Sequence, residues 1–200
     1  MMELSKAERL KIIRDEVWNL KESPLYEYRV ANGYYPVIGE GSHDAKIMFV
    51  GEAPGGSEAR TGRPFCGPAG KFLDELLESA GIKREAVYIT NILKDRPPDN
   101  RDPLPEEVAL YAQFLNDQIE IIQPEVIVTL GRYSLRYLME KFGLGDQIKP
   151  ISQIHGQVFS SQSLFGGVKI ITQYHPAAAI HNPNLKETIK KDFQVLKELF

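Results

Sequence analysis

Glu52, Asn91 and His175 each stand within three residues of the end of a short apolar run. A carboxylate can orient a water molecule, a carboxamide can read the donor and acceptor pattern of a ligand, and an imidazole can stabilise a developing negative charge. Taken alone, each of these residues is as easily explained as a turn or cap residue. Their chemistry becomes useful only where the fold brings the three side chains together.

Phe65 stands in a loop rich in proline and glycine, Arg63-Pro-Phe-Cys-Gly-Pro-Ala-Gly70, directly before a predicted helix. A loop with such a restrained backbone can present an aromatic ring to a planar ligand. A position in the hydrophobic core explains the same residue equally well.

A second loop, residues 174–181, has the sequence Tyr-His-Pro-Ala-Ala-Ala-Ile-His. Its small side chains would let a phosphate backbone come close, and the apolar Ile180 would fit a narrow groove. A plain connection into the last helix, starting at Asn182-Pro183, explains these residues as well.

Positive charge gathers near these loops although the chain as a whole carries a formal net charge of −3. Because no global positive field exists, a nucleic-acid partner must be met by a local patch. The cations concerned are Arg60, Arg63, Lys71, Lys94, Arg96, Arg101, Lys186, Lys190 and Lys191. Acidic residues are interleaved with several of them, and a solvated helix face explains the last three equally well.

Four short, mostly β-branched runs predict buried strands, and helical periodicity lies between them. The strands are predicted at 46–50, 87–90, 126–130 and 168–172, and the helices at 5–21, 69–80, 105–122, 132–142 and 184–199. This alternation predicts one domain over residues 1–200, with an N-terminal helix within 1–21. The expected fold is a three-layer α/β/α sandwich with a central four-stranded parallel sheet. Ligands bind such sheets beyond the carboxyl ends of the strands, where the three polar residues would meet.

Cysteine content and hydropathy exclude several classes of protein. The single cysteine, Cys66, excludes an intrachain disulfide framework and a cluster held by four thiolates of this chain. No apolar run approaches the roughly 18 residues of a membrane span, and the charged start lacks the apolar core of a signal peptide. We expect a cytoplasmic protein without a membrane partner, and a monomer.

Five motifs in register resemble the uracil-DNA glycosylase superfamily, most closely its family 4, whose members carry an iron–sulfur cluster. The resemblance extends over about residues 20–200. The motifs are Val50-Gly-Glu-Ala-Pro-Gly55, Thr61–Gly70, Tyr88–Lys94 with Arg96-Pro-Pro98 and Asn100-Arg101, Val128-Thr-Leu-Gly131, and Tyr174-His-Pro-Ala-Ala178.

The resemblance implies that the enzyme flips a deoxyuridine out of DNA and hydrolyses its N-glycosidic bond. Phe65 would stack on the uracil, Asn91 would read its edge, and His175 would stabilise negative charge on uracil O2. Glu52 would lie near the sugar, where it could orient water, offset positive charge on the sugar, or crowd a thymine methyl group.

The resemblance also implies further contacts with the base and with DNA. Ala53 and Pro54 would help to line the uracil pocket. Arg63 is a candidate DNA contact, and the loop that enters the minor groove would comprise Ala177, Ala178, Ala179, Ile180 and His181.

The sequence departs from family 4 at the four positions of the cluster cysteines, which are occupied by Leu20, Ser23, Asp95 and Tyr111. We therefore expect no cluster, no metal and no cofactor. The predicted function is release of uracil from single- or double-stranded DNA, with water as the nucleophile and an abasic site as the product. Alternatives are a glycosylase with a shifted range (hypoxanthine, xanthine or mismatched thymine) and a catalytically silent DNA-binding module.

Overall fold

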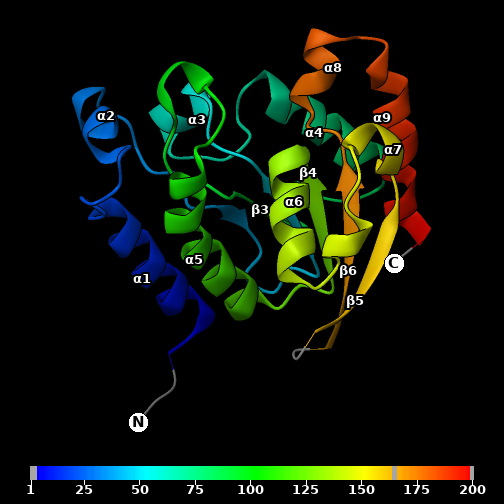
Figure 1. Ribbon diagram of the computed structural model, residues 1–200, viewed down its shortest axis with the longest axis horizontal. Helices are drawn as coiled ribbons and strands as arrows, with labels where there is room; N and C mark the ends of the chain where they lie inside the picture. Colours follow the sequence, from blue (N-terminus) through cyan, green and yellow to red (C-terminus); the bar gives the residue numbers. More distant parts are fainter. Residues whose placement is uncertain (1–3, 164–165, 199–200) are drawn as a thin grey trace.

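A six-stranded sheet with the order β1-β3-β2-β4-β6-β5 forms the centre of the computed structural model, which describes residues 4–163 and 166–198 (Figure 1). The strands are β1 (Glu40–Gly41), β2 (Ile47–Gly51), β3 (Tyr88–Asn91), β4 (Val126–Leu130), β5 (Val158–Ser163) and β6 (Gly166–Gln173).

The four inner strands pair in parallel, as predicted, but the expectation of only four strands was wrong. β1 and β5 pair in antiparallel fashion at the two edges of the sheet. Neither edge strand has the apolar run on which the prediction depended, because β1 has only two residues and β5 is rich in serine.

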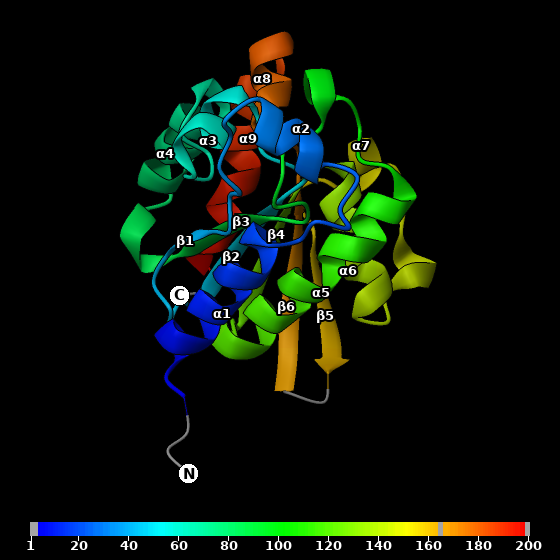
Figure 2. The ribbon, with the colours of Figure 1, turned by 90° about the vertical axis from the view of Figure 1, so that its left-hand side faces the viewer.

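Helices cover both faces of the sheet, so the three-layer architecture is confirmed. Figure 2 shows α3 and α4 on one side of the sheet and α5, α6 and α7 on the other. The helices are α1 (Lys6–Trp18), α2 (Tyr26–Ala31), α3 (Gly56–Thr61), α4 (Pro68–Ser79), α5 (Pro105–Ile122), α6 (Arg132–Lys141), α7 (Ile151–Ile154), α8 (Ala177–His181) and α9 (Leu185–Phe193).

Alternate residues of the buried strands pack into two separate hydrophobic cores, one on each face of the sheet. Met48 and Val50 of β2 point into the core beneath α1, α5 and α6. Ile47 and Phe49 point into the core beneath α4 and α9. Because both faces of the sheet are covered, every residue of β2 is buried. This explains why the sequence of β2 is a continuous apolar run.

Two C-terminal segments differ from the predictions. The helix predicted over 184–199 ends as α9 at Phe193 and continues as a 3-10 turn over Gln194–Glu198, and position 199 lies outside the described residues. The predicted loop 174–181 contains the short helix α8. Its run of three alanines, the best helix formers, explains this turn of helix.

Candidate active site

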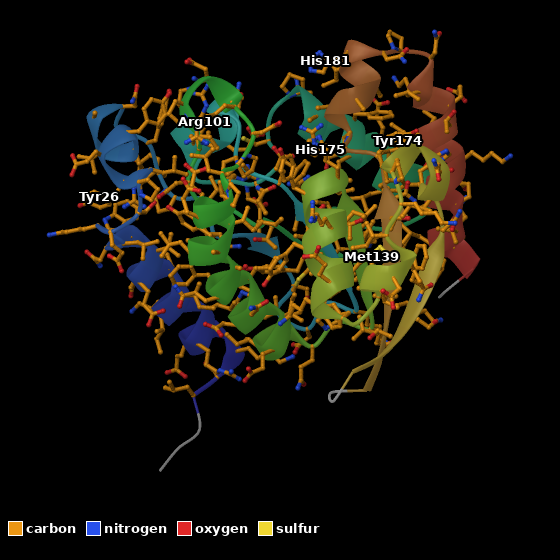
Figure 3. The ribbon with its side chains drawn as sticks, viewed as in Figure 1. Tyr26, Arg101, Met139, Tyr174, His175 and His181 are labelled. Carbon is orange, nitrogen blue, oxygen red and sulfur yellow. The ribbon has the colours of Figure 1, made fainter. Side chains whose placement is uncertain are left out.

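A cleft of about 470 Å³ opens at the carboxyl edge of the parallel strands. In Figure 3, Arg101 lies above α5, whereas His175 and His181 lie toward α8, and all three line the cleft. Besides the two histidines, the predicted site residues that line it are Glu52, Ala53, Pro54, Phe65, Asn91 and Ala177. The convergence expected from the strand ends is therefore present in the structure.

Asn91 and Phe65 meet over Gly51, the last residue of β2. A Cβ built on Gly51 would lie 2.3 Å from Asn91 Oδ1 and 2.7 Å from Phe65 Cζ, so only glycine permits this approach. Asn91 Oδ1 is buried and has no hydrogen-bond partner among the described residues. Leaving a buried acceptor unpaired costs about 1–3 kcal/mol, which a ligand N–H group would recover.

The loop that carries Phe65 is held in a strained conformation. Phe65 has a φ of 48°, which is rare for a residue with a side chain. The backbone of Gly70 makes room for this turn, since a Cβ there would overlap the Phe65 carbonyl oxygen at 1.7 Å. Glu58 Oε1 fixes the next two residues by accepting hydrogen bonds from Cys66 N (3.0 Å) and Gly67 N (2.8 Å). The aromatic ring is therefore positioned by the backbone around it.

His175 is held as a neutral imidazole with a defined tautomer. Burial lowers its pKa to about 4, against a smaller opposing effect of Glu58. The N–H of Ala177 donates to His175 Nδ1 at 3.1 Å, so the ring proton resides on Nε2. The ring stacks on Phe65 with 5.5 Å between centroids. His175 can thus donate a hydrogen bond from Nε2 to a ligand near Phe65.

Glu52 has a carboxyl group that titrates near neutrality. Burial, together with the negative charge of Asp102, raises its pKa to about 7, and the positive charge of Arg132 opposes the shift. The backbone of Glu52 is fixed, because its carbonyl accepts a hydrogen bond from Leu93 N at 3.0 Å. A half-buried carboxylate beside a cleft is suited to general-base or electrostatic chemistry.

Lys94 does not belong to a surface patch of positive charge, contrary to the prediction. It is fully buried, and its Nζ donates to the Asn91 carbonyl oxygen (2.7 Å), Thr90 Oγ1 (2.9 Å) and Gln118 Oε1 (2.7 Å). These bonds tie the end of β3 to α5. Lys94 therefore supports the backbone of Asn91 from behind the cleft.

The predicted DNA contacts lie in different surroundings. Arg63 is outside the set of cleft-lining residues and forms a two-pronged ion pair with Glu40 at 2.8 and 3.0 Å. Ala177 and His181 line the cleft, Ile180 is exposed, and Ala179 is buried against the core. Ala178 is partly exposed on the same helix. DNA contact by these residues stays a prediction.

Sequence reasoning counted Arg101 only among the cations that follow Asn91 and gave no site role to Asn100 or Asp102, yet these three residues form one wall of the cleft. Asp102 pairs with Arg132, and Arg101 pairs with Glu107 at the start of α5. These residues follow no strand end and repeat at no regular spacing. The signals in the sequence were the motif Asn100-Arg101 and the interleaved charges of the segment, and such charges are also typical of a solvated loop.

The residues at the four positions where the sequence departs from the cluster cysteines of family 4 do not fit an iron–sulfur cluster. Three of them form a buried polar network in which Tyr111 Oη lies 2.6 Å from Asp95 Oδ2 and 2.7 Å from Ser23 Oγ. Arg29 completes it by donating to both Asp95 oxygens. Leu20 is buried beside them in the core. These positions supply no thiolate, and their oxygens already bond to one another.

Fold and site together define an α/β protein with a cleft beyond the carboxyl edge of its sheet that is lined by aromatic and hydrogen-bonding side chains. The family model of the uracil DNA glycosylase superfamily matches residues 38–197. The chain therefore belongs to the uracil DNA glycosylase superfamily.

Curated relatives cover nearly the whole chain. A type-4 uracil-DNA glycosylase of Sulfurisphaera tokodaii is 41% identical over 95% of this chain and 84% of its own length. Those of Archaeoglobus fulgidus and Thermotoga maritima are 43% and 40% identical, each over 96% of this chain and over 94% and 95% of their own lengths. None of the described helices combines the length and the apolar character needed to cross a membrane.

Proposed function

We propose that this protein hydrolyses the N-glycosidic bond of deoxyuridine in DNA, releasing uracil and leaving an abasic site. The observation that carries the proposal is the unpaired Asn91 oxygen beside the stacked rings of Phe65 and His175. Uracil offers an N3–H donor next to its O4 acceptor, which matches a carboxamide. Cytosine presents the reverse pattern, which an Asn91 amide in this same orientation would leave unsatisfied.

In the proposed reaction, the nucleotide leaves the base stack and uracil enters the cleft against Phe65. The Nε2–H group of His175 donates to uracil O2. As the C–N bond breaks, its electron pair passes to the base, and this hydrogen bond stabilises the negative charge that develops on O2. A neutral imidazole is suited to this task because it donates the hydrogen bond without transferring its proton to the base.

The carboxylate of Glu52 is proposed to act on the sugar side. It orients the water that adds to C1′, or it offsets the positive charge that grows on the sugar, and the same group could crowd a thymine methyl. Water is the proposed nucleophile, since the cleft-lining residues in the described part of the chain include no lysine. The amine of Lys94 is buried behind Asn91 and bound to three oxygens.

A base-release assay separates this function from its alternatives. Single-stranded and duplex oligonucleotides would carry uracil, hypoxanthine, xanthine or mismatched thymine, and the free base would be measured after each incubation. We expect uracil to be released fastest, with an alkali-labile abasic site left in uncut DNA. Faster release of another base would indicate the shifted range, and binding without release of any base would indicate the silent module.

A further inference from the structure

Two guanidinium groups lie beside one another at the rim of the cleft. Arg60 belongs to α3 and Arg96 to the segment after β3, and they meet at Gly56. A Cβ built on Gly56 would lie 3.5 Å from Arg60 Nη1 and 3.5 Å from Arg96 Cζ. The distance between these two atoms is therefore no more than twice 3.5 Å. Gly55, the chain neighbour of Gly56, and Pro97, the chain neighbour of Arg96, line the cleft.

Neither guanidinium forms an ion pair with a carboxylate in the described part of the chain. Arg96 donates to two neutral acceptors, Asn100 Oδ1 from Nε and Tyr34 Oη from Nη1, each at 2.8 Å. Arg60 is exposed. Other arginines of this edge, Arg63 and Arg101, are instead neutralised by Glu40 and Glu107. Two close positive charges without a counter-charge repel each other and attract an anion.

We propose that Arg60 and Arg96 together bind one phosphodiester group of the DNA strand that carries the flipped nucleotide. This inference rests on the proposed function, since it requires DNA in the cleft. Guanidinium forks match phosphate oxygens and form charge-assisted hydrogen bonds with them. Arg96 also holds Asn100, a cleft-lining residue with a φ of 54°, so phosphate binding would steady the cleft wall.

The first test measures how salt affects DNA binding. The probe is a single-stranded oligonucleotide with one 2′-fluorodeoxyuridine, whose glycosidic bond resists hydrolysis. Arg60→Gln should weaken binding about tenfold and make the slope of log affinity against log salt shallower by about 0.7. Lys11→Gln, which removes one positive charge from the remote helix α1, should leave both quantities unchanged.

A second variant separates the charge of Arg96 from its support of the loop. Tyr34→Phe removes the acceptor of Arg96 Nη1 but keeps both guanidinium groups, so it should retain the wild-type salt slope. Arg96→Gln should reduce that slope by the amount seen for Arg60→Gln. The double variant should lose little more, because both side chains contact the same phosphate.

The decisive experiment replaces single phosphodiesters of the probe by uncharged methylphosphonates, one position at a time. At one position near the 2′-fluorodeoxyuridine, the replacement should weaken wild-type binding and remove the difference between wild type and Arg60→Gln. If Arg60→Gln kept its full effect at every position, or bound like wild type throughout, the phosphate site would be refuted. Binding is measured here without base release, so failure of the proposed glycosylase activity would be seen separately in the release assay.

Discussion

At the scale of single residues, the pKa of Glu52 makes the charge of the cleft change near pH 7. If the carboxylate is the active form, kcat/KM should rise with pH and level off above about 7. Asp102→Asn removes a charge that raises this pKa, so the rising limb should move to lower pH. Arg132→Gln removes a charge that lowers it and should move the limb the opposite way. Profiles of kcat/KM against pH for the three proteins check this, and an identical limb in all of them would exclude Glu52 as the titrating group.

Removal of the imidazole tests the stabilisation of the leaving base. His175→Ala should slow single-turnover uracil release by about two to three orders of magnitude, the usual cost of losing one such donor. DNA affinity should stay close to wild type, because the hydrogen bond gains strength only as charge develops on the base. Rapid-quench kinetics and anisotropy titrations measure the two quantities. An equal loss of affinity would make His175 a residue that merely shapes its loop.

The main polar residues of the site were predictable because a strand end is visible in sequence. Glu52, Asn91 and His175 follow apolar runs, and the topology of a parallel sheet brings those ends together. The buried role of Lys94 was not predictable, since its three oxygen acceptors come from residues as distant as Gln118. The positive φ of Phe65 likewise depends on a tertiary neighbour, Gly70.

At the scale of elements, α8 presents Ile180 to solvent with 47% of its surface exposed. A side chain that wedges into the minor groove matters only where a base stack must be held open. Ile180→Gly should therefore slow uracil release from duplex DNA more than from single strands. Ala178→Gly, which loosens the same helix without removing a large side chain, should affect both substrates alike.

The comparison of the two initial rates for each variant provides the measurement. If Ile180→Gly slowed both substrates to the same extent, α8 would be a connection into α9 and no wedge.

Periodicity predicted the inner strands and the long helices because each buries a whole face or stripe of apolar side chains. It missed β1, β5 and the short helices α2, α3, α7 and α8, each of which buries few side chains. These short elements are set by pairing with a neighbouring strand or by local helix propensity, and neither leaves an apolar pattern in the sequence.

At the scale of the whole molecule, the network around Asp95 joins the N-terminal helices to the α/β core. Arg29, only 5% exposed, donates to Asp95 and to the carbonyl oxygens of Val17 and Trp18. Asp95→Ala would leave a buried positive charge unpaired, so it should lower the free energy of unfolding by about 3–5 kcal/mol. Urea denaturation measures this change.

The matched control is Glu140→Ala, which breaks the exposed pair of Glu140 with Arg136. Pairs of this kind contribute about 0–1 kcal/mol, so the control should barely change stability. Equal small losses in both variants would contradict the assignment of this network as the tie between the N-terminal helices and the core.

The net charge of −3 also acts at this scale, because it leaves DNA affinity to local cations. The need for a local patch of positive charge could be predicted from the composition alone. Which cations are free could not be predicted, since the partners of Arg63 and Arg101 are set by the folded chain.

The most direct test of the central claim, that this cleft reads uracil through Asn91, is the base selectivity of Asn91→Asp. A carboxylate cannot donate to uracil O4, so the variant should release uracil at least about tenfold more slowly, as expected for one lost buried pairing. Release of cytosine should rise relative to that of uracil. Single-turnover assays on matched oligonucleotides containing uracil or cytosine give both rates. Wild-type rates on uracil would show that Asn91 is structural and that the base is read elsewhere.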